Sequence, residues 1–268
     1  MKIDARGIVG FSILGAFVAA GALAPWIAPY DPTVPHDRVA DALRPPGSPG
    51  FLFGTDLYAR DLLSRLLHGA RISLAVATAS VALSATIGVA VGAAAGEAGG
   101  ALDAVAMRIT DVFLSIPRLV LLLAASAFVG RSPAVLVAFL GATGWMGAAR
   151  LVRSEVRVLR EREFVLAARG LGLSRAQVLL RHVLPNALPA AVVSATLGLG
   201  GALLSEATLS FLGFGVAEPL ASWGAMIADG AKMIGTAWWV ATLPAIAIAL
   251  CVTAANLAGD ALREGLPR

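Results

Sequence analysis

Charged residues are scarce in this chain of 268 residues: they make up 14% of it, against 58% for hydrophobic residues. In a soluble domain about a quarter of the residues are charged. Here long uncharged runs rich in Ala, Leu, Val and Gly separate the charges, as expected where each charge placed in lipid is costly. The deficit excludes an ordinary water-soluble domain and predicts an all-α protein that crosses a membrane several times.

The chain also lacks most of the side chains from which enzymes and metal sites are built. Its single cysteine, Cys251, cannot form an intrachain disulfide or a thiolate metal site, and its apolar surroundings predict a buried position. His36 and His68 have no His, Cys or carboxylate at ligand spacing. There is no Gly-x-Ser-x-Gly, His-Glu-x-x-His or Walker-type Gly-x-x-x-x-Gly-Lys motif. We therefore expect no catalytic residue, no metal site and no cofactor or nucleotide held by this chain.

Lysine is almost absent, with Lys2 and Lys232 the only examples, so arginine carries nearly all of the net charge of +4. The arginines flank apolar segments, and no basic face is interleaved with aromatic residues as in nucleic-acid-binding domains. We therefore expect these arginines to lie beside a lipid bilayer and not to bind nucleic acid.

Six stretches are candidates to cross a hydrocarbon core about 30 Å thick, which takes about 20 apolar residues per helix. Five are uncharged windows, and one must be assembled from a stretch that contains Arg108, Asp111 and Arg118. In chain order the six are 7–30, 72–96, 104–130, 132–149, 183–205 and 233–259.

Three units follow from this pattern. Residues 1–30 form an N-terminal tip and the first transmembrane helix, and residues 31–71 form a Pro-rich extracytoplasmic loop with an amphipathic segment. Residues 72–268 form a five-helix core with a basic insert at 150–185. Because arginines are concentrated in the insert and near both termini, we expect the insert, the N-terminus and the C-terminus to face the cytoplasm.

The basic insert begins as a helix. Arg150, Arg153, Arg157 and Arg160 follow one another at intervals of three, four and three residues, so they share one helix face. By itself, such a face is typical of a solvated extension whose arginines reach toward lipid phosphates.

The rest of the insert, "EFVLAARGLGLSRAQVLLRHVLPN" at 163–186, predicts a compact projecting knob. Ala167 and Ala168 are small enough to let another backbone come close. Gly170 and Gly172 permit a sharp reversal of the chain, including a positive φ. A helix, a tight turn and a second helix are therefore expected.

The second helix of this knob has its own start and stop signals. Ser174 with Gln177 three residues later is a capping box, which predicts a helix over 175–183. His182 lies on one face of that helix, and Pro185 is expected to end it. A short rigid helix of this kind is suited to dock into a groove of another protein.

This knob resembles the EAA loop of bacterial ABC-importer permeases, whose pattern is Glu-Ala-Ala, three residues, Gly, nine residues, then Ile-x-Leu-Pro. Leu166 stands where Glu is usual, and His182 stands where Ile is usual. The "RHVLPN" ending is typical of the dipeptide, oligopeptide and nickel permeases. The residues that match at the right spacing are Ala167, Ala168, Gly172, Leu184 and Pro185.

Other blocks support the resemblance, which covers nearly the whole chain and is closest to the second, or "C", permease of peptide importers. The block at 53–74 is similar to the family's Gly-Thr-Asp-x-x-Gly-Arg-Asp block, with Ala59 in place of the usual Gly. Those at 96–117, 205–216 and 222–227 are similar to further blocks of the family.

The resemblance implies a function and a set of partners. Permeases of this family form a heterodimer with a related permease in the bacterial inner membrane. Two cytoplasmic ATPase subunits, which bind ATP and Mg, and an extracytoplasmic substrate-binding protein complete the importer. Contact with the ATPases is expected through Ala167, Ala168, Gly170, Gly172, Ser174, Gln177, His182, Leu184 and Pro185.

Three polar residues in the predicted spans have alternative interpretations. Glu206 either lines the translocation path and meets the amino terminus of a peptide, or forms internal hydrogen bonds, which we favour. Arg108 and Asp111, three residues apart, are expected to be a packing clamp or interfacial pair and not a substrate site. Gly88, Gly92 and Gly96 have the spacing of a close helix contact.

Several readings of the function stay open at this point. A peptide cargo is preferred, but nickel chelates and other small solutes share the scaffold. A self-contained secondary transporter is disfavoured because no internal repeat is seen. An intramembrane enzyme is disfavoured because no nucleophile and base face each other within a span.

Overall fold

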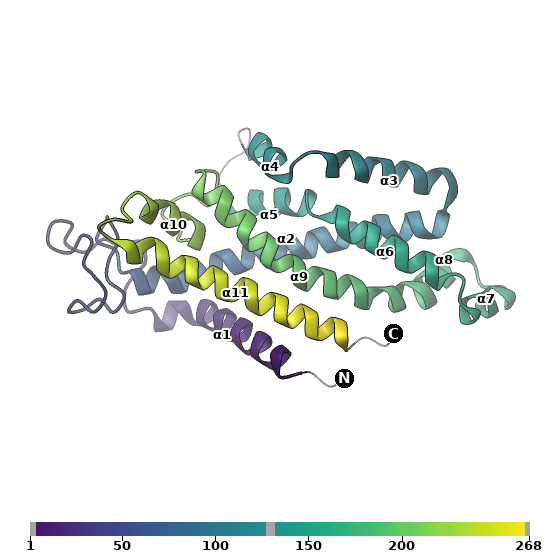
Figure 1. The fold of residues 1–268 in the computed structure, drawn as a ribbon, viewed down its shortest axis with the longest axis horizontal. Coiled ribbons are helices and arrows are strands. Elements are labelled where there is room, and N and C mark those ends of the chain that lie inside the picture. Colours follow the sequence, from purple (N-terminus) through teal and green to yellow (C-terminus); the bar gives the residue numbers. More distant parts are fainter. Residues whose placement is uncertain (1–3, 127–131, 266–268) are drawn as a thin grey trace.

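The computed structural model describes residues 4–126 and 132–265, and within these ranges every regular element is a helix. The helices form an elongated bundle (Figure 1). A long irregular loop lies at one end, and the short helices α7 (Glu163–Gly170) and α8 (Arg175–Val178) lie at the other. Both described termini lie toward the end with α7 and α8.

Four helices in the described part of the chain are long and apolar enough to cross a membrane. They are α1 (Ala5–Ile27), α2 (Leu62–Ala98), the continuous helix Arg175–Phe211 that includes α9 (Leu184–Phe211), and α11 (Trp238–Glu264). A fifth candidate is the pair α5 (Pro133–Ala142) and α6 (Trp145–Leu159), which are bent by 42° at Thr143–Gly144.

The span predicted at 104–130 is interrupted. It divides into α3 (Gly100–Ser115) and α4 (Arg118–Ser126), and Ile116 between them is extended with φ −92° and ψ 128°. This is the conformation favoured by a residue before a proline, here Pro117. Neither half is among the membrane-spanning candidates, and residues 127–130 lie outside the described ranges. The predicted count of six helices is therefore not confirmed.

The second span begins earlier than its uncharged window. The Asp61 side chain accepts a hydrogen bond from the Ser64 N–H at 2.7 Å and caps α2, so the helix starts at Leu62 and not at residue 72. The expected unit boundary at 71/72 consequently lies inside α2. The amphipathic segment predicted before it forms the first turns of this helix.

Helix α2 lies at the centre of the bundle and packs against α5, α6 and α9. Three glycines allow its contact with α6: a Cβ atom at Gly88, Gly92 or Gly96 would lie 2.6, 2.4 or 2.9 Å from atoms of Ala148, Ala149 and Val156 respectively. The close helix contact predicted from the spacing of these glycines is confirmed.

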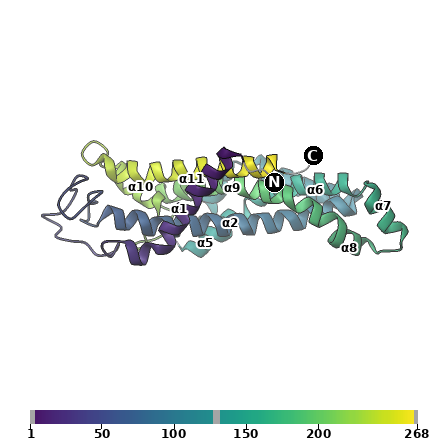
Figure 2. The ribbon, with the colours of Figure 1, turned by 90° about the horizontal axis from the view of Figure 1, so that it is seen from below.

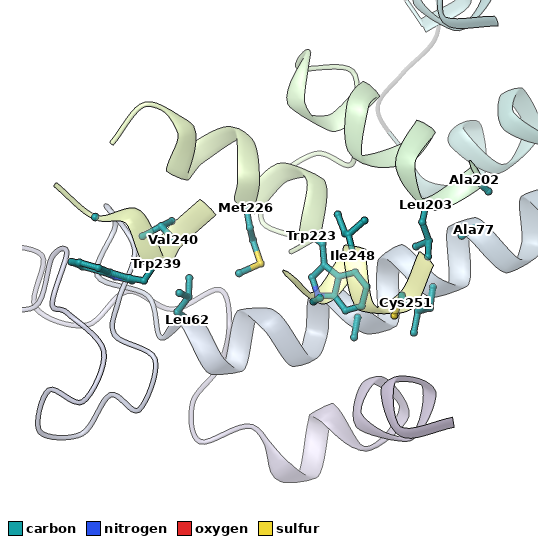
Figure 3. Close-up of a cluster of buried hydrophobic side chains, with 14 residues drawn as sticks. Leu62, Ala77, Ala202, Leu203, Trp223, Met226, Trp239, Val240, Ile248 and Cys251 are labelled. Atoms are coloured by element: carbon teal, nitrogen blue, oxygen red, sulfur yellow. The ribbon is translucent and has the colours of Figure 1, made fainter. Parts of the chain in front are cut away.

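The main hydrophobic cluster lies in the half of the bundle near the long loop (Figure 3). Trp223, at the start of the short helix α10 (Trp223–Ala231), lies beside Ile248 of α11. Leu62 of α2 lies closer to Met226 of α10. Cys251 is fully buried in this cluster, as its apolar run predicted.

Candidate functional site

The predicted knob is present and projects beyond the long helices (Figure 2). It consists of α7, a turn, α8 and the π-helical segment η1 (Leu179–Val183), which continues into α9. The short helix of the knob and a long apolar helix are thus one continuous rod, Arg175–Phe211.

The reversal between the two helices of the knob depends on one glycine. Gly172 has a φ of +84°, and a Cβ atom there would meet nothing within 4 Å, so conformation and not space requires glycine. Gly170 is the last residue of α7 and does not have a positive φ. The predicted participation of both glycines in the turn is therefore correct only for Gly172.

The capping box predicted at the start of the second helix is present. The Ser174 N–H donates to Gln177 Oε1 at 2.9 Å, and the Gln177 N–H donates to Ser174 Oγ at 3.3 Å.

The expected stop at Pro185 is wrong. The backbone widens into η1, where the Leu184 N–H bonds to the carbonyl of Leu179, and Pro185 then lies in the first turn of α9. Because η1 and α9 belong to one continuous helix, the proline leaves one backbone hydrogen bond unmade, and the widened π-helical turn before it accommodates the ring. The Asn186 side chain adds a hydrogen bond of 2.6 Å to the His182 carbonyl.

The base of the knob has its own small hydrophobic cluster. Val165 and Ala168 of α7 pack with Val178, Val183 and Ala187 and with residues of α2 and α6. Ala168 is only 6% exposed, so it packs inside the knob and does not lie on its surface. Its small size serves the close approach of α7 to the knob's own second helix.

The outer surface of the knob carries several large apolar side chains among polar ones. Leu171, at the turn, is 84% exposed, and Phe164, Leu166 and Leu180 are also exposed. Ala167 lies on the same exposed part of α7. A projecting, rigidly based surface with several exposed large apolar side chains is typical of a protein contact site.

Arginines of α6 join it to α3. Arg153 forms a two-point ion pair with Asp103, and Arg157 lies 3.8 Å from the same carboxylate. The hydrogen bond from Arg153 holds the pKa of Asp103 below its ordinary value. Arg150 pairs with Asp111. The arginine face predicted on this helix is therefore engaged with protein carboxylates, and not only with solvent or lipid.

Two further arginines close the carboxyl end of α2. Arg160 donates to the carbonyls of Gly96 and Glu97 at 3.1 and 3.3 Å, and Arg169 of the knob pairs with the Glu97 carboxylate at 3.1 Å. A cation at the last carbonyls of a helix complements its dipole. The knob is thereby attached to α2 as well as to α9.

The polar residues predicted in the spans are separated in the structure. Asp111 pairs with Arg150, while Arg108 is exposed on α3, so the two do not form the i, i+3 pair expected from their spacing.

Glu206 is fully buried among hydroxyl groups. Ser210 Oγ donates to Glu206 Oε1 at 2.8 Å and Ser73 Oγ donates to Oε2 at 3.3 Å. Ser73 Oγ also accepts a hydrogen bond of 3.1 Å from the Trp223 N–H. These contacts join α2, α9 and α10.

Residues 88–268 match the protein family described as the binding-protein-dependent transport system inner membrane component. The chain belongs to this family. It is 38% identical over 270 residues to the di/tripeptide transport system permease protein DppC of Pseudomonas aeruginosa, covering 97% of this chain and 88% of that protein. It is 39% identical over 274 residues to the dipeptide transport system permease protein DppC of Escherichia coli, covering 99% and 89%.

The fold also agrees with a solved ABC transporter. A chain of the MetNI methionine ABC transporter in an inward-facing conformation superposes with a TM-score of 0.58 at 24% identity, covering 76% of this permease and 96% of that chain. The permease is thus a multi-pass membrane protein with the fold of an ABC-importer subunit.

Sequence reasoning missed a buried charge cluster at the loop end of the permease. Asp56 accepts from Arg60 Nε at 2.7 Å and lies 3.4 Å from Arg65 Nε, and all three side chains are nearly inaccessible to solvent. Arg60 also pairs with Glu218 at 3.3 Å. The block at 53–74 has three of these charges within ten residues, which is a signal in the sequence. The fourth, Glu218, follows α9 in the chain, and its pairing with Arg60 was not predictable.

Proposed function

We propose that this permease is one membrane subunit of an ATP-driven importer that carries di- or oligopeptides into a bacterial cell. Relatives named for di/tripeptide and dipeptide transport align over nearly their whole length, which supports a peptide cargo. The partners are a homologous permease in a heterodimer, two cytoplasmic ATPases and an extracytoplasmic substrate-binding protein. ATP and Mg bind to the ATPases and not to this chain.

The observation that carries the proposal is the knob at 163–183. It is exposed, carries an apolar residue at its tip, and is attached to the bundle at three points: through η1 to α9, through Arg169 to α2, and through Val165 and Ala168 to a hydrophobic cluster shared with α2 and α6. A surface held in this way transmits a push without bending. Movement of an ATPase groove would therefore be passed directly to Arg175–Phe211.

The nine coupling residues predicted from the sequence divide into two roles in this proposal. Ala167 is exposed and would touch the ATPase, together with Leu171 at the tip. Most of the others shape the knob, through its core, its turn, its capping box or its passage into α9. They are Ala168, Gly172, Ser174, Gln177, His182, Leu184 and Pro185. Gly170 ends α7.

The proposed orientation places the knob and both termini in the cytoplasm and the loop at 31–61 outside. The basic residues near the knob agree with the tendency of cytoplasmic segments to be rich in arginine and lysine. Both described termini lie toward the knob end of the bundle (Figure 1). If the knob is cytoplasmic, both termini are therefore cytoplasmic as well.

Co-purification through this chain tests the coupling surface. The permease is co-expressed with its sister permease and ATPases, and ATPase recovery is compared among the wild type, Leu171→Asp and Ala167→Asp. Both side chains are exposed, so the knob is expected to keep its fold while a charge enters the contact. At least a tenfold fall in ATPase recovery is expected, with the sister permease retained.

A matched control is Val39→Asp, which places the same charge at an exposed apolar residue at the opposite end of the molecule. This variant is expected to keep the ATPases. Equal recovery of ATPase with Leu171→Asp and with the wild type would contradict the proposed contact. The cargo is tested separately, by ATP-dependent accumulation of labelled dialanine in proteoliposomes that contain the complete importer.

A further inference from the structure

Arg118 is a cation without a carboxylate partner among the described residues. It is the first residue of α4, and the one hydrogen bond its side chain makes there runs from Nη2 to the carbonyl of Leu140 at 3.2 Å. Its Nε atom is buried and has no hydrogen-bond partner. Arg118 is thus a partly buried charge, and withdrawing a charged group from water is costly unless something of opposite sign meets it.

Six other arginines are wholly or partly buried in the described ranges. Each one is paired with a carboxylate or with the carbonyl end of a helix. They are Arg44, Arg60, Arg65, Arg153, Arg160 and Arg169. Like Arg160, Arg118 donates to a carbonyl in the last turn of a helix, here Leu140 of α5. It differs from Arg160 in having a buried Nε atom without a hydrogen-bond partner, and from the other five in having no carboxylate partner in the described ranges.

Arg118 lines a cavity of about 140 Å³ between α2, α9 and the junction of α5 with α6. Ser84 and Ser194 also line it, and neither hydroxyl makes a hydrogen bond within the described residues, so both are free to donate. The polar side chains in this cavity offer donors and one positive charge, but no carboxylate. An anion is the ligand that such a site binds.

The cavity lies at the middle of the membrane-spanning helices. Ser80, in its wall, is the central residue of α2, and Ser194 lies next to the centre of Arg175–Phe211. The helix of α5 and α6 is broken beside it at Gly144, where a Cβ atom would lie 2.8 Å from Ser84 Oγ. Ionisable residues at this depth face cavities and mark transport paths.

We propose that Arg118, with Ser84 and Ser194, binds the C-terminal carboxylate of the peptide during its passage through the membrane. This inference rests on the proposed function and specifies which end of the cargo the permease recognises. A guanidinium and two hydroxyls together replace the water around a carboxylate, which every free peptide carries whatever its side chains. The site would thus serve peptides of varied sequence.

Reconstitution of the complete importer with Arg118→Gln, Arg118→Lys and the control Arg263→Gln tests this proposal. Arg263 is an exposed arginine near the end of α11, far from the cavity. Initial rates of ATP-driven dialanine uptake are measured with saturating substrate-binding protein, and the thermal midpoint of the empty complex is measured alongside. Removing a charge-assisted hydrogen bond is worth about tenfold or more in binding.

The expected result is an uptake rate about tenfold lower for Arg118→Gln, a smaller loss for Arg118→Lys, and none for the control. The midpoint of the empty complex is expected to stay the same or rise, because an uncompensated charge has been removed. Unchanged uptake in Arg118→Gln overturns the inference alone. A lower midpoint with loss of the sister permease also overturns it, because Arg118 would then be paired with a carboxylate of that subunit. A wild-type complex that does not transport dialanine overturns the proposed cargo instead.

Discussion

Both ends of the permease are rich in arginine, but they use it differently. At the loop end, Arg60 and Arg65 are almost completely buried around Asp56. At the knob end, Arg153 and Arg169 are partly exposed, with 26% and 36% of the side chain accessible, although they too pair with carboxylates. The loop-end ion pairs thus centre on three side chains that are almost completely buried, whereas the knob-end pairs include arginines that water reaches.

This difference has a mechanical consequence. Breaking a buried ion pair costs about 3–5 kcal/mol, because an uncompensated charge is left in a medium of low dielectric constant. Breaking a pair that water reaches costs less, down to about 0–1 kcal/mol where the pair is fully exposed, since water replaces the partner. The knob end is therefore the end whose contacts can be exchanged at low cost, as a part moved by ATPases requires.

Among the substitutions that test this difference, Asp56→Asn should lower the stability of the permease most. It removes the charge shared by two buried guanidinium groups, and we expect the free energy of unfolding to fall by about 3–5 kcal/mol. The measurement is denaturant unfolding of the detergent-solubilised permease. Asp41→Asn, which loses a partly exposed pair with Arg44, is the control and should cost less than about 1 kcal/mol. Equal effects of the two would remove the distinction between buried and exposed charge.

Gly92→Leu should disrupt the close contact between α2 and α6. Its side chain would start 2.4 Å from the Ala149 carbonyl oxygen and force α2 and α6 apart, at a cost of about 3 kcal/mol. Gly201→Ala in α9 is the matched control, because nothing lies within 4 Å of the added Cβ atom. That control should be neutral or slightly stabilising. Thermal unfolding monitored by tryptophan fluorescence distinguishes the two, and a tolerated Gly92→Leu would contradict the close packing.

Asp103→Asn should have a moderate effect that depends on pH. Because the pKa of Asp103 is lowered in the folded state, its pair with Arg153 stabilises the protein above the ordinary carboxyl pKa. That contribution is lost as the pH falls through the lowered value. At neutral pH the substitution should cost about 1–2 kcal/mol. The difference from the wild type should shrink when unfolding is followed below pH 4, and a constant difference would speak against the ion pair.

Ala59→Gly should have the smallest effect and the opposite sign. Ala59 has a φ of +59°. It stands where the Gly-Thr-Asp-x-x-Gly-Arg-Asp block that residues 53–74 resemble has glycine. A left-handed backbone costs a residue with a Cβ atom about 1–2 kcal/mol, of which the greater freedom of glycine in the unfolded chain cancels a part. A gain of up to about 1 kcal/mol is expected in the same unfolding assay. A loss of stability would mean that the buried methyl group of Ala59 contributes more than the strain it imposes.

Local signals in the sequence were sufficient for the knob. The Ser174–Gln177 capping box, the positive φ of Gly172 and the buried Cys251 all follow from interactions between near neighbours or from a uniformly apolar run. Pro185 was misjudged because a π-helical segment, which no local signal announced, lets the helix continue past it. The span at 104–130 is not confirmed, because Pro117 interrupts the helix within the described residues.

Pairings between distant residues were beyond reach of the sequence. Asp111 was expected to bind Arg108, three residues away, but binds Arg150 on another helix. Ala168 was expected on the docking surface but packs inside the knob. In both cases the neighbour along the chain was known and the neighbour in space was not.

Hydropathy, charge and turn chemistry are properties of short stretches, so the amino-acid sequence is sufficient to predict a multi-pass helical membrane protein with a projecting basic insert. Which arginines are neutralised depends on the packing of the helices. Asp56 and Glu218 meet the same guanidinium group across 162 residues, and Arg118 meets no carboxylate in the described ranges, since such distances depend on how the helices pack. Because of that packing, Arg118 lies in the cavity that we propose as the binding site for the cargo carboxylate.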